Sequence, residues 1–282
     1  MQNTFRDDDL THFAAEGPPA LPAGGEVIER DGAQLWFASF GAGPAVMLLH
    51  GGMGNANQLG HQVPALLEAG YRVVVMDTRG HGRSSWDGGA FSYVRLAEDA
   101  LAVLDRLGID KAAIVGWSDG ACTGFEMARL APERVSGVMF FACNVDSSGS
   151  WPFEMTQVIG NCLVRHKKDN EALSPDPQRF DAMSQALQVM QSSQPNYTAA
   201  DLREIAVPVT AVIGEGDEFI RPEHIRYIAE TIPGARYVEM PEVTHFAPVQ
   251  RPDVFNGVVL EFLRDLAGPQ NKKDQGAFTS SI

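Results

Sequence analysis

The chain has 282 residues, of which 44% are hydrophobic and 21% charged, and its formal net charge is −14. This length can bury one large core, or one core with an insertion. The negative charge argues against nucleic acid and anionic membrane as partners, because both bind basic surfaces. No apolar run approaches the roughly 18 residues that a membrane-spanning helix needs.

The N-terminal segment is polar and acidic and lacks the apolar core of a secretory signal, so we expect a cytoplasmic protein. Residues 1–24 mix acids with Gly-Pro-Pro and Pro-Ala-Gly-Gly, a composition typical of a poorly ordered lead-in. Cys122, Cys143 and Cys162 lack metal-type spacing and are expected to be reduced, buried thiols. Cys122 lies inside a predicted helix, which favours packing over catalysis. The sequence indicates neither a metal nor a cofactor.

The first half of the chain alternates short apolar runs with amphipathic segments. Residues 26–30 and 34–40 flank Asp31-Gly32, which predicts a β-hairpin. Continuous apolar runs predict strands covered by helices on both faces, as in a parallel sheet; they span 45–49, 72–76, 112–115 and 135–143. Helical spacing predicts two intervening helices. The first buries Val63, Leu66 and Leu67 and ends at Gly70. The second ends at Gly108 and buries Leu96, Ala100, Val103 and Leu107.

Three of the five residues after the first apolar run, His50-Gly51-Gly52-Met53-Gly54, are glycines. Glycine lets a backbone bend sharply and approach another group closely, and ligands bind at such strand ends. We expect half of an oxyanion hole here, with the amide of Gly52 as first candidate donor and that of Met53 as second. A plain glycine turn is the alternative. His50 is expected to hold the loop by hydrogen bonds.

The second strand runs into a polar glycine loop at residues 77–85. This loop lacks the Lys-Ser/Thr of a phosphate-binding loop, so nucleotide binding is not indicated. His81 in the loop is a possible base, but a structural role is favoured.

The next strand leads into Gly116-Trp117-Ser118-Asp119-Gly120, and a helix is predicted to follow from Ala121. A G-x-S-x-G pattern between strand and helix is a nucleophile elbow. Gly116 and Gly120 lack the β-carbon that would clash in so tight a turn. The turn would present the hydroxyl of Ser118, and the amide of Asp119 would point at the same space as an oxyanion donor.

No buried strand is evident from 144 to 206. Two amphipathic helices are expected there, separated by Ser174-Pro175-Asp176-Pro177. The first would carry Met155 and the second Met183 and Met190. These methionines suit an adaptable pocket wall, although packing within the inserted segment is an equal alternative.

The strand pattern resumes at 209–213, and three acids, Glu215, Asp217 and Glu218, follow it. A helix is expected from Pro222, and a last strand at 237–240 precedes a loop with His245. The closing helix runs from Pro252 to Gly268-Pro269, with a frayed tail at 269–282.

Five motifs carry a resemblance to a known family: Leu49-His50-Gly51-Gly52, Asp77-x-Arg79-Gly80-His81-Gly82-x-Ser84, Gly116-Trp117-Ser118-Asp119-Gly120, Gly214-x-x-Asp217 and Thr244-His245-Phe246. Over about residues 26–267 the chain resembles the α/β-hydrolase fold superfamily. The resemblance implies a mostly parallel central sheet with helices on both faces, formed by residues 25–143 and 207–268, and an inserted helical cap at 144–206. The elbow is similar to that of valacyclovirase-like esterases.

The resemblance implies a catalytic triad. Ser118 would be the nucleophile, and His245 the base that takes its proton and then delivers it to the leaving group. Asp217 would orient the imidazole and stabilise its charged form, with Glu215 as the reserve acid. Reasoning from the residues supports the same roles, since a serine hydroxyl is a weak nucleophile unless a base lies within hydrogen-bond reach. Of the histidines, His245 alone follows a late strand; His61 is expected on a helix surface. Trp117 and Phe246 are expected in the substrate pocket.

The expected reaction is hydrolysis of a small-molecule carboxylic ester, with thioester, lactone or amide as further possibilities. Carbon–carbon bond hydrolysis, perhydrolysis and a non-catalytic sensor remain open, as does the oligomeric state. A dehalogenase or epoxide hydrolase of this fold would carry Asp in place of Ser118. The carboxylate of Asp119 could select substrates with a nearby ammonium group, or it could cap the following helix.

Overall fold

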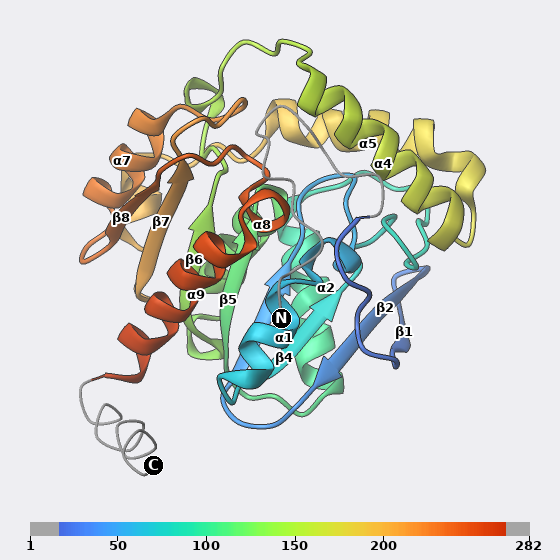
Figure 1. The fold of residues 1–282 in the computed structure, drawn as a ribbon, viewed down its shortest axis with the longest axis horizontal. Helices are drawn as coiled ribbons and strands as arrows, with labels where there is room; N and C mark the ends of the chain where they lie inside the picture. Colours follow the sequence, from blue (N-terminus) through green and yellow to red (C-terminus); the bar gives the residue numbers. More distant parts are fainter. Residues whose placement is uncertain (1–16, 269–282) are drawn as a thin grey trace, which may run out of the picture.

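The computed structural model describes residues 17–268 (Figure 1). Residues 1–16 of the predicted lead-in and the predicted tail at 269–282 lie outside the described residues.

One eight-stranded sheet, in the order β1-β2-β4-β3-β5-β6-β7-β8, organises the chain. The first two strands form an antiparallel hairpin, β2 pairs antiparallel with β4, and all later neighbours are parallel. The strands are β1 (Glu26–Arg30), β2 (Ala33–Phe40), β3 (Ala45–Leu49), β4 (Arg72–Met76), β5 (Ala112–Trp117), β6 (Val135–Phe141), β7 (Val209–Gly214) and β8 (Arg236–Met240). The predicted mostly parallel sheet is confirmed.

Asp31 and Gly32 form the turn of the hairpin between β1 and β2. Asp31 and Gly32 both have positive φ, 45° and 76°, which is the conformation that a two-residue hairpin turn requires. The central strands β3 to β7 are buried on both faces, as their continuous apolar runs predict. The edge strand β1 is largely exposed instead.

Helices cover the sheet and extend past its end (Figure 1). Helix α1 contacts α9, α2 contacts α3, and α7 packs on β7 and β8. The α-helices are α1 (Gln62–Glu68), α2 (Tyr93–Arg106), α3 (Asp119–Leu130), α4 (Gln157–Leu173), α5 (Phe180–Ser193), α6 (Ala199–Arg203), α7 (Pro222–Thr231), α8 (Ala247–Gln250) and α9 (Pro252–Ala267). None of the helices within residues 17–268 is long and apolar enough to cross a membrane.

Helices α4, α5 and α6 fall between β6 and β7, where the strand pattern is interrupted. Figure 1 shows α4 and α5 at the top, beyond the end of the strands. Met155 was expected in the first of these helices, but it precedes α4 because the Thr156 hydroxyl accepts a hydrogen bond from the amide of Ile159 and caps the helix.

Two further expectations differ from the structure. Strand β6 ends at Phe141 rather than 143, because Ala142 has a positive φ of 58° that turns the chain out of the sheet. His61 was expected on a helix surface, but it lies at the N-terminal end of α1 and is only 5% exposed. The short helices α6 and α8 were not predicted.

Candidate active site

The elbow between β5 and α3 holds Ser118 in a strained backbone conformation. Its φ is 54° and its ψ is −123°, a region that residues with a β-carbon rarely adopt. The two flanking glycines are required by close backbone contacts. A β-carbon at Gly116 would lie 2.3 Å from the carbonyl oxygen of Gly120, and one at Gly120 would lie 2.3 Å from that of Leu49. The tight turn expected from the G-x-S-x-G pattern is therefore present.

A buried Asp–His pair lies at the ends of β7 and β8. The Nδ1 atom of His245 is 3.0 Å from Oδ2 of Asp217. Oδ1 of Asp217 also accepts the backbone amides of Phe219 and Ile220, so three groups fix this carboxylate. Burial is the largest single effect on the pKa of His245 and lowers it. The charge and hydrogen bond of Asp217, together with the charges of Glu218 and Asp119, outweigh burial, so the pKa lies above its usual value.

The other two acids after β7 have different contacts. Glu215 accepts the backbone amide of Glu242 at an exposed position. Glu218 accepts the backbone amide of His245 at 3.1 Å, and its charge also raises the pKa of the imidazole. Burial raises the pKa of Glu218 itself. Asp217 is therefore the carboxylate that binds the imidazole, while Glu218 holds the main chain of the same residue.

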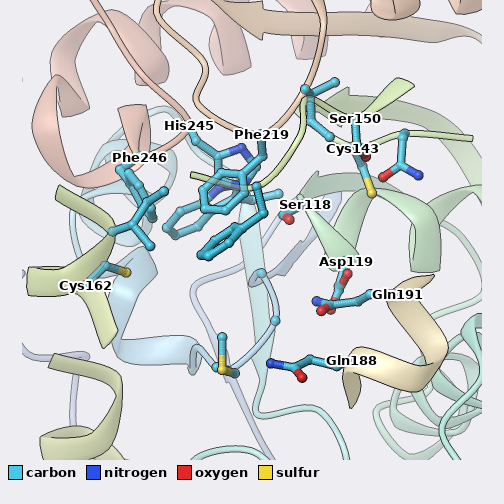
Figure 2. Close-up of a pocket in the computed structure, with 18 of the residues that line it drawn as sticks. Ser118, Asp119, Cys143, Ser150, Cys162, Gln188, Gln191, Phe219, His245 and Phe246 are labelled. Atoms are coloured by element: carbon cyan, nitrogen blue, oxygen red, sulfur yellow. The ribbon is translucent and has the colours of Figure 1, made fainter. Parts of the chain in front are cut away.

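Ser118, His245 and Phe246 line one cavity of about 670 Å³ (Figure 2). Trp117 and Met155 line the same cavity. The Nδ1 atom of His245 is bound to Asp217, which leaves Nε2 as the nitrogen available for proton transfer. Among the hydrogen bonds of the described residues, none joins this nitrogen to the Ser118 hydroxyl; such contacts often tighten only when substrate is bound. The Phe219 ring packs edge-on against the imidazole, with centroids 4.7 Å apart.

Two methionines expected in the pocket wall do not line this cavity. Met183 and Met190 are buried and, with Leu187, form the inward stripe of α5. The neighbouring stripe of the helix faces the cavity instead and carries Gln188 and Gln191 (Figure 2). The expectation failed because helical spacing identifies the apolar stripe of a helix but not which stripe faces the cavity.

The glycine loop after β3 packs against the elbow. Gly52 and Met53 both line the cavity, and Met53 has a positive φ of 59°. A β-carbon on Gly52 would lie 2.5 Å from Oδ2 of Asp119, which shows how closely the two segments approach.

His50 holds this loop, as expected. Its Nε2 accepts the Thr78 amide, and its Nδ1 lies 2.7 Å from the Gly51 carbonyl oxygen. Burial lowers the pKa of His50 to about 4, so the ring is neutral at neutral pH. His81 is also buried; it contacts the Arg79 carbonyl and does not line the large cavity, which favours its structural role.

The side chain of Asp119 lies in the cavity wall. Its Oδ1 accepts a hydrogen bond from the Tyr93 hydroxyl at 2.7 Å, and its Oδ2 accepts one from Nε2 of Gln191 at 2.9 Å. Burial raises the pKa of this carboxyl group. Its partners are side chains of α2 and α5 rather than amides of α3, so it makes no capping hydrogen bond.

Sequence reasoning missed several residues of the wall. Tyr93 and Gln191 line the cavity from α2 and α5, helices for which the sequence pattern identifies only the apolar residues that face the core. Phe219 comes from the loop after Asp217. Position next to the three candidate acids was the one signal available for Phe219.

Comparisons with known proteins point to the same fold. A model of the α/β-hydrolase fold family matches residues 44–163. The chain is 28% identical over 257 residues to a candidate non-heme bromoperoxidase, BpoC, of Mycobacterium tuberculosis, covering 81% of this chain and 97% of that protein. These matches confirm the resemblance to the α/β-hydrolase superfamily that the sequence motifs indicated. Its eight-stranded, mostly parallel sheet with helices is that of the α/β-hydrolase fold.

Two further proteins match along most of the chain. The human serine hydrolase BPHL is 27% identical over 252 residues, covering 84% of this chain and 85% of that protein. The solved structure of Est816, described as an N-acyl homoserine lactone degrading enzyme, is 26% identical with a TM-score of 0.66, and the match covers 84% of this chain and all of that one.

Proposed function

We propose that this α/β hydrolase is a serine hydrolase that cleaves carboxylic esters of small substrates through an acyl-enzyme. The supporting observation is the shared cavity of Ser118 and His245, with the imidazole bound to Asp217 on its far side. The strained elbow holds the hydroxyl where a substrate carbonyl can approach it.

In the first half-reaction, the Ser118 hydroxyl oxygen attacks the ester carbonyl carbon while Nε2 of His245 accepts its proton. The carbonyl oxygen becomes an oxyanion, which the backbone amides of Asp119 and Gly52 stabilise, with Met53 as the alternative donor. Each such donor contributes about 3 kcal/mol to the transition state. The imidazolium then protonates the departing alcohol, leaving Ser118 acylated.

In the second half-reaction, His245 takes a proton from water, and the water oxygen attacks the acyl carbon. The imidazolium then gives the proton to the departing Ser118 oxygen, which releases the acid and restores the free enzyme. Asp217 stabilises the imidazolium in both halves, consistent with its effect on the pKa of His245. Neither step requires a metal or cofactor.

Lactones are the second candidate substrate class. A lactone is a cyclic ester, so the same residues would open it without a separate leaving alcohol. The similarity to Est816, which is described as degrading N-acyl homoserine lactones, favours this class. Carbon–carbon bond hydrolysis and perhydrolysis also use a Ser-His-Asp triad, and no contact in the cavity favours either.

The test is labelling with a fluorophosphonate probe together with turnover of p-nitrophenyl acetate and a simple lactone. We expect one label, on Ser118, and multiple turnovers. Ser118→Ala should remove both, whereas Ser150→Ala, which changes another serine of the cavity wall, should keep labelling at Ser118. Labelling without turnover would favour a sensor, and wild-type turnover by Ser118→Ala would reject the mechanism.

A further inference from the structure

Two cysteines lie in contact directly behind the elbow. Cys122 belongs to the first turns of α3, and Cys143 follows the end of β6. Their Sγ atoms are 2.8 Å apart, although the residues are 21 positions apart in the sequence. This separation is shorter than non-bonded sulfur atoms normally keep, and a disulfide bond would need it to fall to about 2.05 Å.

The two thiols differ in their access to the cavity. Cys143 lines it and is labelled in Figure 2, whereas Cys122 is not among the lining residues and is fully buried. The Sγ atom of Cys122 also lies 3.3 Å from the carbonyl oxygen of Asn144, so this thiol has a second acceptor for its hydrogen. A small reagent that enters the cavity therefore meets Cys143 first.

We propose that Cys122 and Cys143 form a modification site, a dithiol that small organic disulfides entering the substrate cavity convert into an intramolecular disulfide. The reaction has two exchange steps. The sulfur of Cys143 attacks one sulfur of the reagent, and the departing thiol carries away the Cys143 proton. The sulfur of Cys122 then attacks that of Cys143, and the second thiol departs with the Cys122 proton. Two protein thiols are oxidised and one reagent disulfide is reduced to two thiols.

The order of the steps has a chemical reason. Burial, together with the contact to Cys143 and the nearby acids, raises the pKa of the Cys122 thiol well above its usual value. This thiol stays protonated at neutral pH and is a poor first nucleophile. It lies in contact with Cys143, however, so it needs no diffusion to close the ring once Cys143 carries a mixed disulfide.

The third cysteine complicates any thiol count, because Cys162 also lines the cavity and contacts Nε2 of His166 at 3.0 Å. The experiment therefore uses Cys162→Ser protein treated with 2-hydroxyethyl disulfide. We expect its two free thiols to disappear and its intact mass to fall by two hydrogen atoms, with no reagent attached. A dithiol reductant should restore both thiols.

Two double variants test the roles. With Cys122→Ser added, Cys143 should keep one hydroxyethylthio group because no second thiol resolves it. With Cys143→Ser added, Cys122 should stay free. The oxidised Cys162→Ser protein should also unfold at a higher temperature than the reduced form, because the cross-link constrains the unfolded chain.

Persistence of both thiols in Cys162→Ser protein, or a stable reagent adduct on it, would overturn the proposal. If a variant does not fold, peptide mapping of oxidised wild-type protein decides the matter. A fragment joining Cys122 to Cys143 supports the site, and pairing of either with Cys162, or no cross-link, refutes it. None of these measurements depends on hydrolytic activity.

Discussion

Replacing Asp217 by asparagine tests which of the three acids after β7 supports the imidazole. The carboxylate is fully buried and lies 3.0 Å from Nδ1 of His245, so water cannot take its place in the variant. The imidazolium formed during the reaction would lose its nearest opposite charge, while Glu218 would retain part of the compensation. We expect kcat to fall by about 10³- to 10⁴-fold, which corresponds to about 4 to 5 kcal/mol in the activation barrier.

The assay is steady-state hydrolysis of p-nitrophenyl acetate, with far-ultraviolet circular dichroism to check folding. Glu215→Gln is the matched control, because that carboxylate is exposed and contacts the amide of Glu242; its kcat should remain within about twofold, as for a surface substitution. The loss of kcat in Glu218→Gln should lie between those of the other two variants, since a Glu218 carboxylate oxygen holds the main chain of His245. A larger loss in Glu215→Gln than in Asp217→Asn would refute this assignment of the acids.

Three further predictions concern the site. Because the pKa of His245 is raised and only the neutral ring accepts a proton, kcat/KM should fall as pH decreases through a pKa above about 6.5, the usual histidine value. Asp217→Asn should move this fall in kcat/KM to lower pH. A fall at the same pH in the variant would contradict the role of Asp217 in raising the pKa. Asp119→Ala should reduce hydrolysis of amino-acid esters more than that of matched esters without an α-amino group if the carboxylate selects ammonium substrates, and an equal change on both would end that hypothesis. Gly120→Ala should lower the free energy of unfolding, measured in urea, by about 1–3 kcal/mol or more, because its β-carbon would meet the Leu49 carbonyl oxygen. The control is Gly257→Ala in α9, where the space is open and the change should be neutral or stabilising. Equal changes in unfolding free energy for the two variants would show that the elbow is not tightly packed.

Much of the fold could be predicted because its signals are local. Strands β3 and β4 match the predicted ranges residue for residue, since continuous apolar runs bounded by glycine and polar loops define them. The elbow followed from two glycines whose missing β-carbons are a steric requirement of the turn. Position after a late strand left three candidate acids and one candidate base, His245, because parallel strands bring their carboxyl ends to one edge of the sheet. Only the resemblance to α/β hydrolases singled out Asp217 among the acids.

The remaining features depend on contacts between distant segments. The bonds from Tyr93 and Gln191 to Asp119 join three helices and leave no periodic signal in the sequence. The contact between Cys122 and Cys143 requires the relative placement of α3 and β6, which residue spacing does not encode. His61 was misplaced because a histidine at the start of a helix looks the same in sequence whether buried or exposed.

Helix α5 packs on the core with one stripe of side chains and lines the cavity with the neighbouring stripe. Met183, Leu187 and Met190 anchor it, whereas Gln188 and Gln191 form part of the cavity wall. Exchanges at the two glutamines would alter what the cavity accepts while leaving the anchoring side chains untouched. New substrate preferences could thus evolve on this helix at little risk to the stability of the protein, while the proposed catalytic residues at the strand ends stay unchanged.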